Sequence, residues 1–96
     1  MIDCTFTAAA VRDYFAAVRF YARLRPKEGR RFVRMFEYTI RRIVDTRPRG
    51  TMTGFKCFAL GMHGYPDYVL YYLDGTAPLV VGVGNMHRRP DYWKGQ

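Results

Sequence analysis

Residues 7–50, TAAAVRDYFAAVRFYARLRPKEGRRFVRMFEYTIRRIVDTRPRG, decide the fold because apolar and charged side chains recur there with the period of an α-helix. Thr7 is a helix-capping residue, and the pattern after it predicts a first helix over residues 8–24. The spacing places one set of side chains inward and three arginines outward: Val11, Phe15, Val18 and Ala22, against Arg12, Arg19 and Arg23.

Pro26 and the KEG that follows it predict a break in the chain, after which a second helix is expected over about residues 28–45. Pro48 and Gly50 should end this helix. The short connection predicts an antiparallel helix hairpin. The expected inward and outward faces of the second helix are Phe32, Phe36, Ile40 and Ile43, and Arg30, Arg34, Glu37 and Arg41.

The remaining apolar segments are rich in β-branched and aromatic residues, which predicts strands over residues 55–60, 68–73 and 79–86. Turn residues divide them into an antiparallel meander, and a short apolar segment at residues 2–6 precedes the first helix. The expected fold class is α+β. In it, an N-terminal short strand and an antiparallel helix hairpin accompany a three- to four-stranded, mainly antiparallel sheet in a single domain, residues 1–96.

The middle predicted strand carries large side chains on both faces, because Tyr71 and Leu73 alternate with Leu70 and Tyr72. One face of the sheet is needed to pack against the apolar faces of the two helices. The other face, including Tyr72, is therefore expected to form a binding surface, although a sheet buried by dimerisation has the same pattern.

The composition is strongly basic, with a net charge of +8 and thirteen Arg against three Lys. Such a surface suits a polyanion or an acidic partner, and solubility alone explains it equally well. No apolar run approaches the roughly 18 residues of a membrane span, and the N-terminus lacks the pattern of a signal peptide. We therefore expect a cytoplasmic protein without membrane association.

Several kinds of chemistry lack the residues they need. The chain contains no serine, which excludes a serine nucleophile, and Cys4 and Cys57 are expected to be reduced thiols in the core. Asp67 and Asp91 have no carboxylate partner in the sequence. The acidic and imidazole side chains also lack any known metal-ligand spacing, so we expect neither a metal nor a cofactor: His63, His87, Asp67 and Asp91.

The order of these elements resembles the RelE/ParE superfamily of type II toxin–antitoxin toxins, and it is more ParE-like than RelE-like. The matching pieces are AAVRDYFAAVRFYARLRP, RRFVRMFEYTIRRIVDTRPRG, DYVLYYLDG and VGVGNMHRRPDYW. The resemblance implies a growth-arresting toxin that a cognate antitoxin neutralises in a toxin–antitoxin hetero-oligomer. It also implies one of two targets: DNA gyrase for ParE-like members, or mRNA on the ribosome for RelE-like members.

Residues 81–93, VGVGNMHRRPDYW, run from a strand into a basic and aromatic corner. We expect this corner to contact the target or the antitoxin, although His87 also fits a plain polar strand end and Trp93 fits a core position. The residues predicted to bind are His87, Arg88, Arg89, Tyr92, Trp93, Lys56 and Tyr72.

Metal-free RNA cleavage needs a proton acceptor, cations for the phosphorane and an acid. In this alternative the catalytic residues are His87, Arg88, Lys56 and Tyr92. The RelE-like pattern also has an Arg inside the middle strand, where this sequence has YVLYY. Gyrase inhibition without catalysis is therefore favoured over a metal-independent endoribonuclease, and a non-toxic basic nucleic-acid-binding module is a further alternative.

Overall fold

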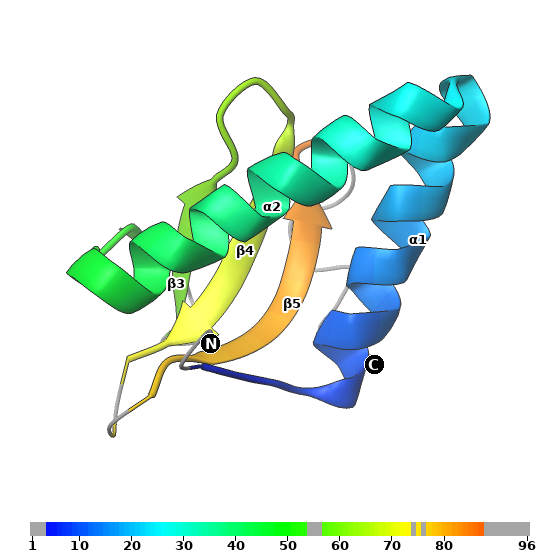
Figure 1. Cartoon of the computed structure of the whole chain (residues 1–96). Helices are drawn as coiled ribbons and strands as arrows, with labels where there is room; N and C mark the ends of the chain where they lie inside the picture. The colour runs from blue at the N-terminus through cyan, green and yellow to red at the C-terminus, as the bar shows by residue number, and fades with distance from the viewer. Residues whose placement is uncertain (1–3, 54–56, 74, 76, 88–96) are drawn as a thin grey trace.

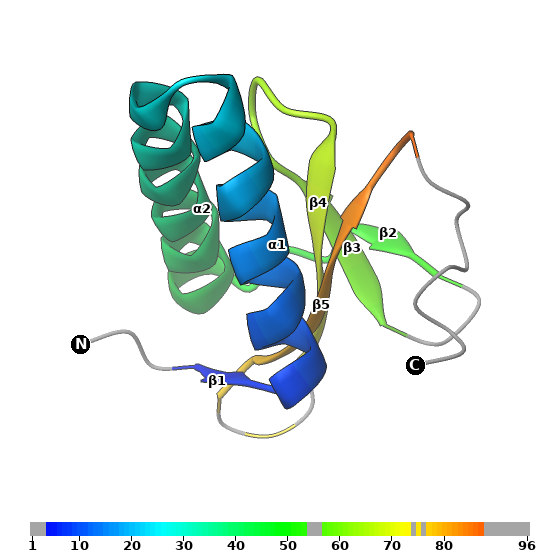
Figure 2. The same cartoon turned by 90° about the vertical axis from the view of Figure 1, so that its right-hand side faces the viewer.

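Two helices pack on one face of a five-stranded sheet (Figures 1 and 2), which confirms the predicted α+β class. The computed structural model describes residues 4–53, 57–73, 75 and 77–87. The sheet order is β1-β5-β4-β3-β2, with β1 parallel to β5 and every other pairing antiparallel. The elements in chain order are β1 (Thr5–Phe6), α1 (Ala8–Leu24), α2 (Pro26–Thr46), β2 (Thr51–Met52), β3 (Phe58–Gly61), β4 (Asp67–Tyr72) and β5 (Leu79–Asn85).

The first helix begins where the sequence predicts, because the Thr7 hydroxyl accepts a hydrogen bond from the Ala10 amide at 3.1 Å. The predicted break after it is wrong. Arg25 alone separates α1 from α2, and Pro26 occupies the first turn of α2, where its missing N–H costs no helical hydrogen bond. The second helix is therefore longer than expected at both ends.

The buried face of α2 is the one that the sequence predicts, and it packs on β4 and β5. The segment that follows α2 is held by Tyr71, a fully buried β4 residue. The Tyr71 hydroxyl donates a hydrogen bond to the Pro48 carbonyl at 2.5 Å. Cys57 is a buried free cysteine, and Cys4 is partly buried and packs against the core. The principal side chains of this core are Phe32, Phe36, Ile40, Ile43, Val69, Tyr71, Val80 and Val83.

The predicted inward face of α1 is wrong in its first half, because Val11 is 42% exposed and Phe15 is 51% exposed. The two helices are in contact at Ala22 and Gly29, where a Cβ on the glycine would stand 2.9 Å from the Ala22 Cβ. From the contact at Ala22 and Gly29 the helices diverge toward the N-terminus of α1 (Figure 1). The side chains of Val11 and Phe15 are therefore not covered by α2. Val18 packs against the core as predicted, and it does so together with Ala10, Tyr14, Ala17 and Tyr21.

The far face of the sheet is less open than predicted. Leu70 is 1% exposed, and Tyr68 and Tyr72 are both partly buried. Tyr68 lies across Gly84 on β5, where any larger residue would collide with the ring. Within the described ranges, no helix is long and apolar enough to span a membrane.

Candidate functional site

The end of β5 meets the start of β4 and the middle of α1 around a pocket of about 270 Å³, here called the corner pocket. Antiparallel pairing sets Asp67 at the start of β4 opposite Asn85 at the end of β5. The His87 amide donates to the Asn85 side chain at 2.8 Å, which holds the chain as it leaves the strand. The lining residues are Asp13, Ala17, Phe20, Tyr21, Pro66, Asp67, Val83, Asn85 and His87.

A buried hydrogen bond forms one wall of the corner pocket. The Tyr21 hydroxyl donates to Asp67 Oδ1 at 2.5 Å, and Asp67 is only 4% exposed. Burial raises the pKa of Tyr21 well above its ordinary value, and the hydrogen bond to Asp67 raises it further. Tyr21 therefore keeps its proton at neutral pH. The hydrogen-bond partner of Asp67 is thus a tyrosine, which the sequence does not indicate.

A second carboxylate of the corner pocket fastens α1 to the sheet. Asp13 accepts a hydrogen bond from the Val83 amide at 3.1 Å, and the Thr7 hydroxyl donates to the Val81 carbonyl at 3.3 Å. These side chains occupy the edge of β5 beyond its two-residue pairing with β1. The pocket thus combines hydrogen-bond acceptors with the imidazole of His87, which suits donor groups on a partner.

The structure describes two of the residues predicted to bind, His87 and Tyr72, and it does not bring them together. Tyr72 pairs with Leu79, at the opposite end of β4 from Asp67 and roughly 17 Å away by the rise of a strand. β3, the strand that follows residue 56, is separated from β5 by β4. The other predicted site residues and Asp91 lie outside the described residues: Lys56, Arg88, Arg89, Tyr92 and Trp93.

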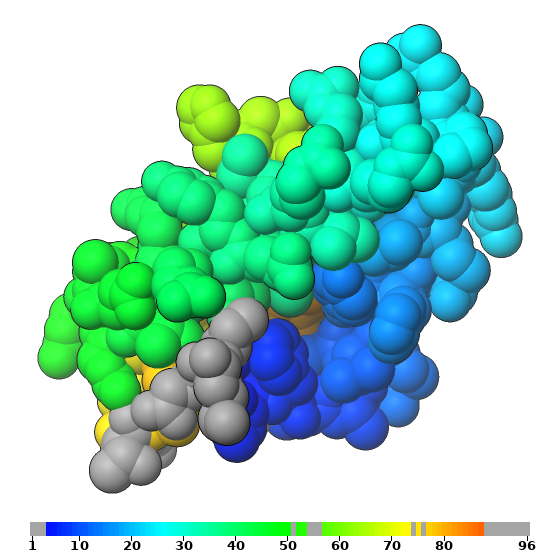
Figure 3. All heavy atoms as spheres, in the orientation of Figure 1, coloured from blue at the N-terminus to red at the C-terminus, as the bar shows by residue number. Residues whose placement is uncertain are grey.

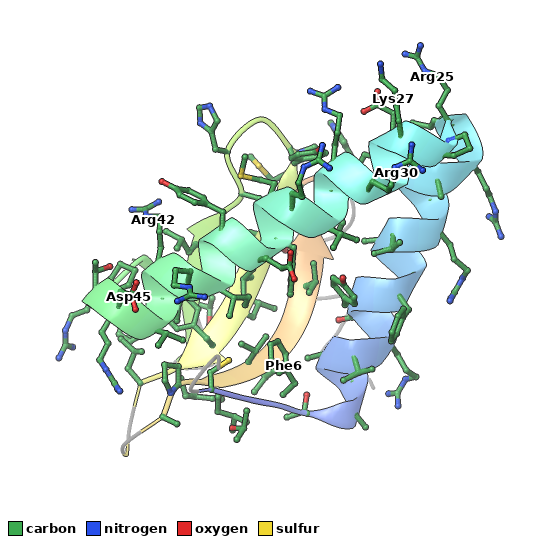
Figure 4. All side chains as sticks on the ribbon, in the orientation of Figure 1. Phe6, Arg25, Lys27, Arg30, Arg42 and Asp45 are labelled. Carbon is green, nitrogen blue, oxygen red and sulfur yellow. The ribbon has the colours of Figure 1, made fainter. Side chains whose placement is uncertain are left out.

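A second concavity, here called the helix groove, lies where α1 and α2 diverge. It encloses about 250 Å³ and is almost entirely apolar. The Tyr14 ring lies 4.6 Å from Phe36 and 5.2 Å from Phe15 between ring centroids, so an aromatic cluster lines the groove. Phe6 of β1 closes its lower end (Figure 4). The lining residues are Phe6, Val11, Tyr14, Phe15, Phe36, Glu37 and Ile40.

Glu37 is the one ionisable carboxylate among the residues that line the helix groove. Burial raises the pKa of Tyr14, and the nearby Glu37 charge raises it further. Arg41 lies one helical turn beyond Glu37 on α2, and Arg19 lies one turn beyond Phe15 on α1; both are exposed. The groove is therefore apolar at its floor and flanked by cations.

Comparison with solved structures identifies a chain from the chromosomal ParDE TA system from P. aeruginosa. The two chains superpose with a TM-score of 0.76 at 15% sequence identity, over 91% of this chain and 98% of that chain. This chain has the fold of a ParDE-system protein. The likeness confirms the RelE/ParE-like fold that the sequence predicts. Neither a protein-family model nor a curated protein matches the sequence.

The ParDE-like fold brings together groups that the sequence does not connect. Tyr21 and Asp67 are 46 residues apart, and no local pattern links them. The helix groove also went unpredicted, although one signal was present. The first half of α1 has more large apolar side chains than one buried stripe can hold, since Tyr14 faces the core while Val11 and Phe15 lie beside it.

Proposed function

We propose that this chain is the toxin component of a type II toxin–antitoxin system, which arrests growth by inhibiting DNA gyrase and is neutralised by a cognate antitoxin. The observation that carries this proposal is the ParDE-like fold over 91% of the chain and 98% of its structural neighbour.

The helix groove supports the antitoxin half of the proposal. Exposed apolar surface between two helices is the feature that an amphipathic helix recognises through residues spaced three or four apart. The flanking arginines favour a partner segment with acidic residues beside its apolar ones. A groove of about 250 Å³ holds only a few side chains, so it serves as an anchor within a larger toxin–antitoxin interface.

The composition of β4 supports gyrase over mRNA as the target. The strand reads DYVLYY and carries no cation, and its Tyr71 is fully buried. Loss of one preorganised cation costs a nuclease about 100-fold or more in rate. We assign His87 and the corner residues Arg88, Arg89, Tyr92 and Trp93 to target binding.

The decisive experiment adds the purified protein to gyrase and plasmid DNA. Inhibited supercoiling with trapped double-strand breaks is the expected result. A parallel cell-free translation reaction tests the alternative, in which mRNA is cut on the ribosome and the His87→Gln variant loses that cutting. Inhibition of translation with intact gyrase activity would replace gyrase by the ribosome as the target.

The corner has its own test in the double variant Arg88→Ala/Arg89→Ala. We expect it to relieve growth arrest and to leave the midpoint of thermal unfolding unchanged. The matched control is Arg12→Ala/Arg19→Ala on α1, which removes the same charge and should remain toxic. Full toxicity of the corner variant would remove these arginines from the target interface.

A further inference from the structure

A third concavity, here called the basic cleft, lies between α2 and the turn that joins β3 to β4. Arg31, Met35 and Tyr38 share one face of α2 because they are spaced three, four and seven residues apart. The turn stands opposite them and projects the exposed His63. The cleft encloses about 590 Å³ and is lined by Glu28, Arg31, Arg34, Met35, Tyr38, His63, Gly64 and Tyr65.

The wall formed by the turn is held in place. The Tyr65 amide donates to the Met62 carbonyl at 3.1 Å, and the Met62 amide donates to the Asp67 carbonyl at 2.9 Å. Gly64 has a φ of 80°, a conformation that favours glycine. The Tyr65 ring packs edge-on against Phe32 at 5.4 Å between centroids, which ties the turn to the core. The cleft is therefore a preformed feature of the fold.

The cations of the cleft are positioned to donate hydrogen bonds outward. Arg31 Nη1 lies 3.3 Å from both carboxylate oxygens of Glu28, which fixes the guanidinium on one side. A guanidinium has five donors, so the two hydrogen bonds to Glu28 do not use up the donors of Arg31. Arg34 and His63 are exposed on the same cleft, and Tyr38 adds a hydroxyl at 56% exposure.

The basic cleft belongs to a longer cationic row. Arg42 lies one turn beyond Tyr38, so the row from Arg31 to Arg42 spans about 16 Å of helix. Other cations of the helix, among them Lys27 and Arg30, project outward beside it (Figure 4), and α2 runs obliquely across the upper part of the visible face (Figure 3). Six Lys and Arg stand against three Asp and Glu in α2: Lys27, Arg30, Arg31, Arg34, Arg41 and Arg42, against Glu28, Glu37 and Asp45.

We propose that the basic cleft binds the sugar–phosphate backbone of duplex DNA, an activity beyond the proposed toxin function and independent of it. Guanidinium groups match phosphate oxygens with paired hydrogen bonds. Duplex DNA carries one charge per about 1.7 Å of its axis, so a 16 Å row faces several phosphates. An acidic peptide would also find apolar contacts in the cleft, at Met35 and Tyr65, so the test below includes an acidic peptide as a competing ligand.

The test measures binding of a fluorescently labelled 20-base-pair duplex by anisotropy between 50 and 200 mM NaCl. The slope of log affinity against log salt counts the phosphate contacts, at about 0.9 per contact. Arg31→Ala/Arg34→Ala should lower this slope by about two. The matched control Arg12→Ala/Arg19→Ala removes the same charge from α1 and should keep the slope of the unchanged protein.

Two results would overturn the proposal. Equal slopes for the two double variants would mean that net charge alone attracts DNA, with no role for the cleft. Labelled poly-glutamate of the same charge as the duplex, bound as tightly and with the same dependence on Arg31 and Arg34, would identify an acidic-protein surface instead. Thermal unfolding of each variant confirms that it is folded. The gyrase assay involves none of these substitutions, so the two proposals fail separately.

Discussion

The two ends of the helix pair use the same stripe of α1 in opposite ways. At the closed end, Ala22 meets Gly29 and the helices touch. At the open end, Val11 and Phe15 belong to the same stripe but face the helix groove and remain about half exposed. Small residues let the helices pack tightly at the closed end. At the open end the helices diverge, so the large side chains of Val11 and Phe15 are not covered.

This difference shows how a helix pair can be stable and still present a binding surface. Burial of Phe32 and its neighbours at the closed end supplies the hydrophobic stabilisation. At the open end, Val11 and Phe15 contribute little to the core, and their apolar side chains remain accessible to another molecule. Substitutions at the two ends should therefore separate folding from binding.

The largest effect is expected for Phe32→Ala. The ring is fully buried and lies against Tyr21, with 4.9 Å between the centroids. Loss of a buried Phe costs about 3–5 kcal/mol of unfolding free energy, through lost transfer energy and a cavity. Urea denaturation followed by circular dichroism measures the loss. A loss of unfolding free energy no larger than that of a surface substitution, about 0.5 kcal/mol, would mean that the closed end does not stabilise the fold.

Gly29→Val tests the contact between the helices directly. Its Cβ would stand 2.9 Å from the Ala22 Cβ, so the helices must move apart at a cost of about 1–3 kcal/mol. Gly61→Val is the matched control, because nothing lies within 4 Å of a Cβ at that position in β3. The same urea experiment compares the two variants. Equal stability would show that the closed end tolerates wider spacing.

Alkaline pH should weaken the closed end through Tyr21. The unfolded chain ionises this phenol near its ordinary pKa of about 10, whereas the folded chain holds its pKa higher. Above about pH 10 the unfolded state therefore binds fewer protons at this phenol than the folded state does. The contribution of Tyr21 to the free energy of unfolding is constant below about pH 10 and falls as the pH rises above it. Tyr21→Phe should flatten the decline of the urea midpoint between pH 9 and 11. An unchanged slope would assign the decline to other groups.

The smallest effect on stability is expected at the open end. Phe15→Asp replaces a side chain that is 51% exposed, and surface changes of this kind stay within about 0.5 kcal/mol. Leu24→Asp, at a position 61% exposed on the same helix, is the control. Thermal unfolding measures both. A large loss for Phe15→Asp alone would place Phe15 in the core and remove the contrast between the two ends.

The sequence predicts most of α2 because the side chains of its predicted inward face are all buried against the same sheet. Phe32, Phe36, Ile40 and Ile43 all face one sheet, so their spacing reports burial directly. The apolar face of α1 packs against α2 at one end and lines the helix groove at the other. Both environments favour apolar residues at the same spacing, so helical periodicity cannot distinguish them. β2, Thr51–Met52, is only two residues long and gives no periodic signal.

The candidate sites were less predictable than the fold. A strand ending in His87 is visible in the sequence, and the structure confirms that His87 lies just beyond β5. The Tyr21–Asp67 bond depends on tertiary packing across 46 residues, which no local pattern encodes. The sequence predicts a binding role for Tyr72, on the second face of the sheet, and for His87, but antiparallel pairing places Tyr72 at the opposite end of β4 from His87.

Growth of cells that express this chain, the proposed toxin, with or without a candidate antitoxin tests the central claim most directly. The product of each gene that adjoins the gene of this chain is tested as the antitoxin, and the proposed toxin is supplied unchanged, as Phe15→Asp or as Leu24→Asp. All three should arrest growth alone, and the antitoxin should restore growth with the unchanged toxin and Leu24→Asp but not with Phe15→Asp. Rescue of Phe15→Asp, or normal growth with the unchanged toxin alone, would contradict the account.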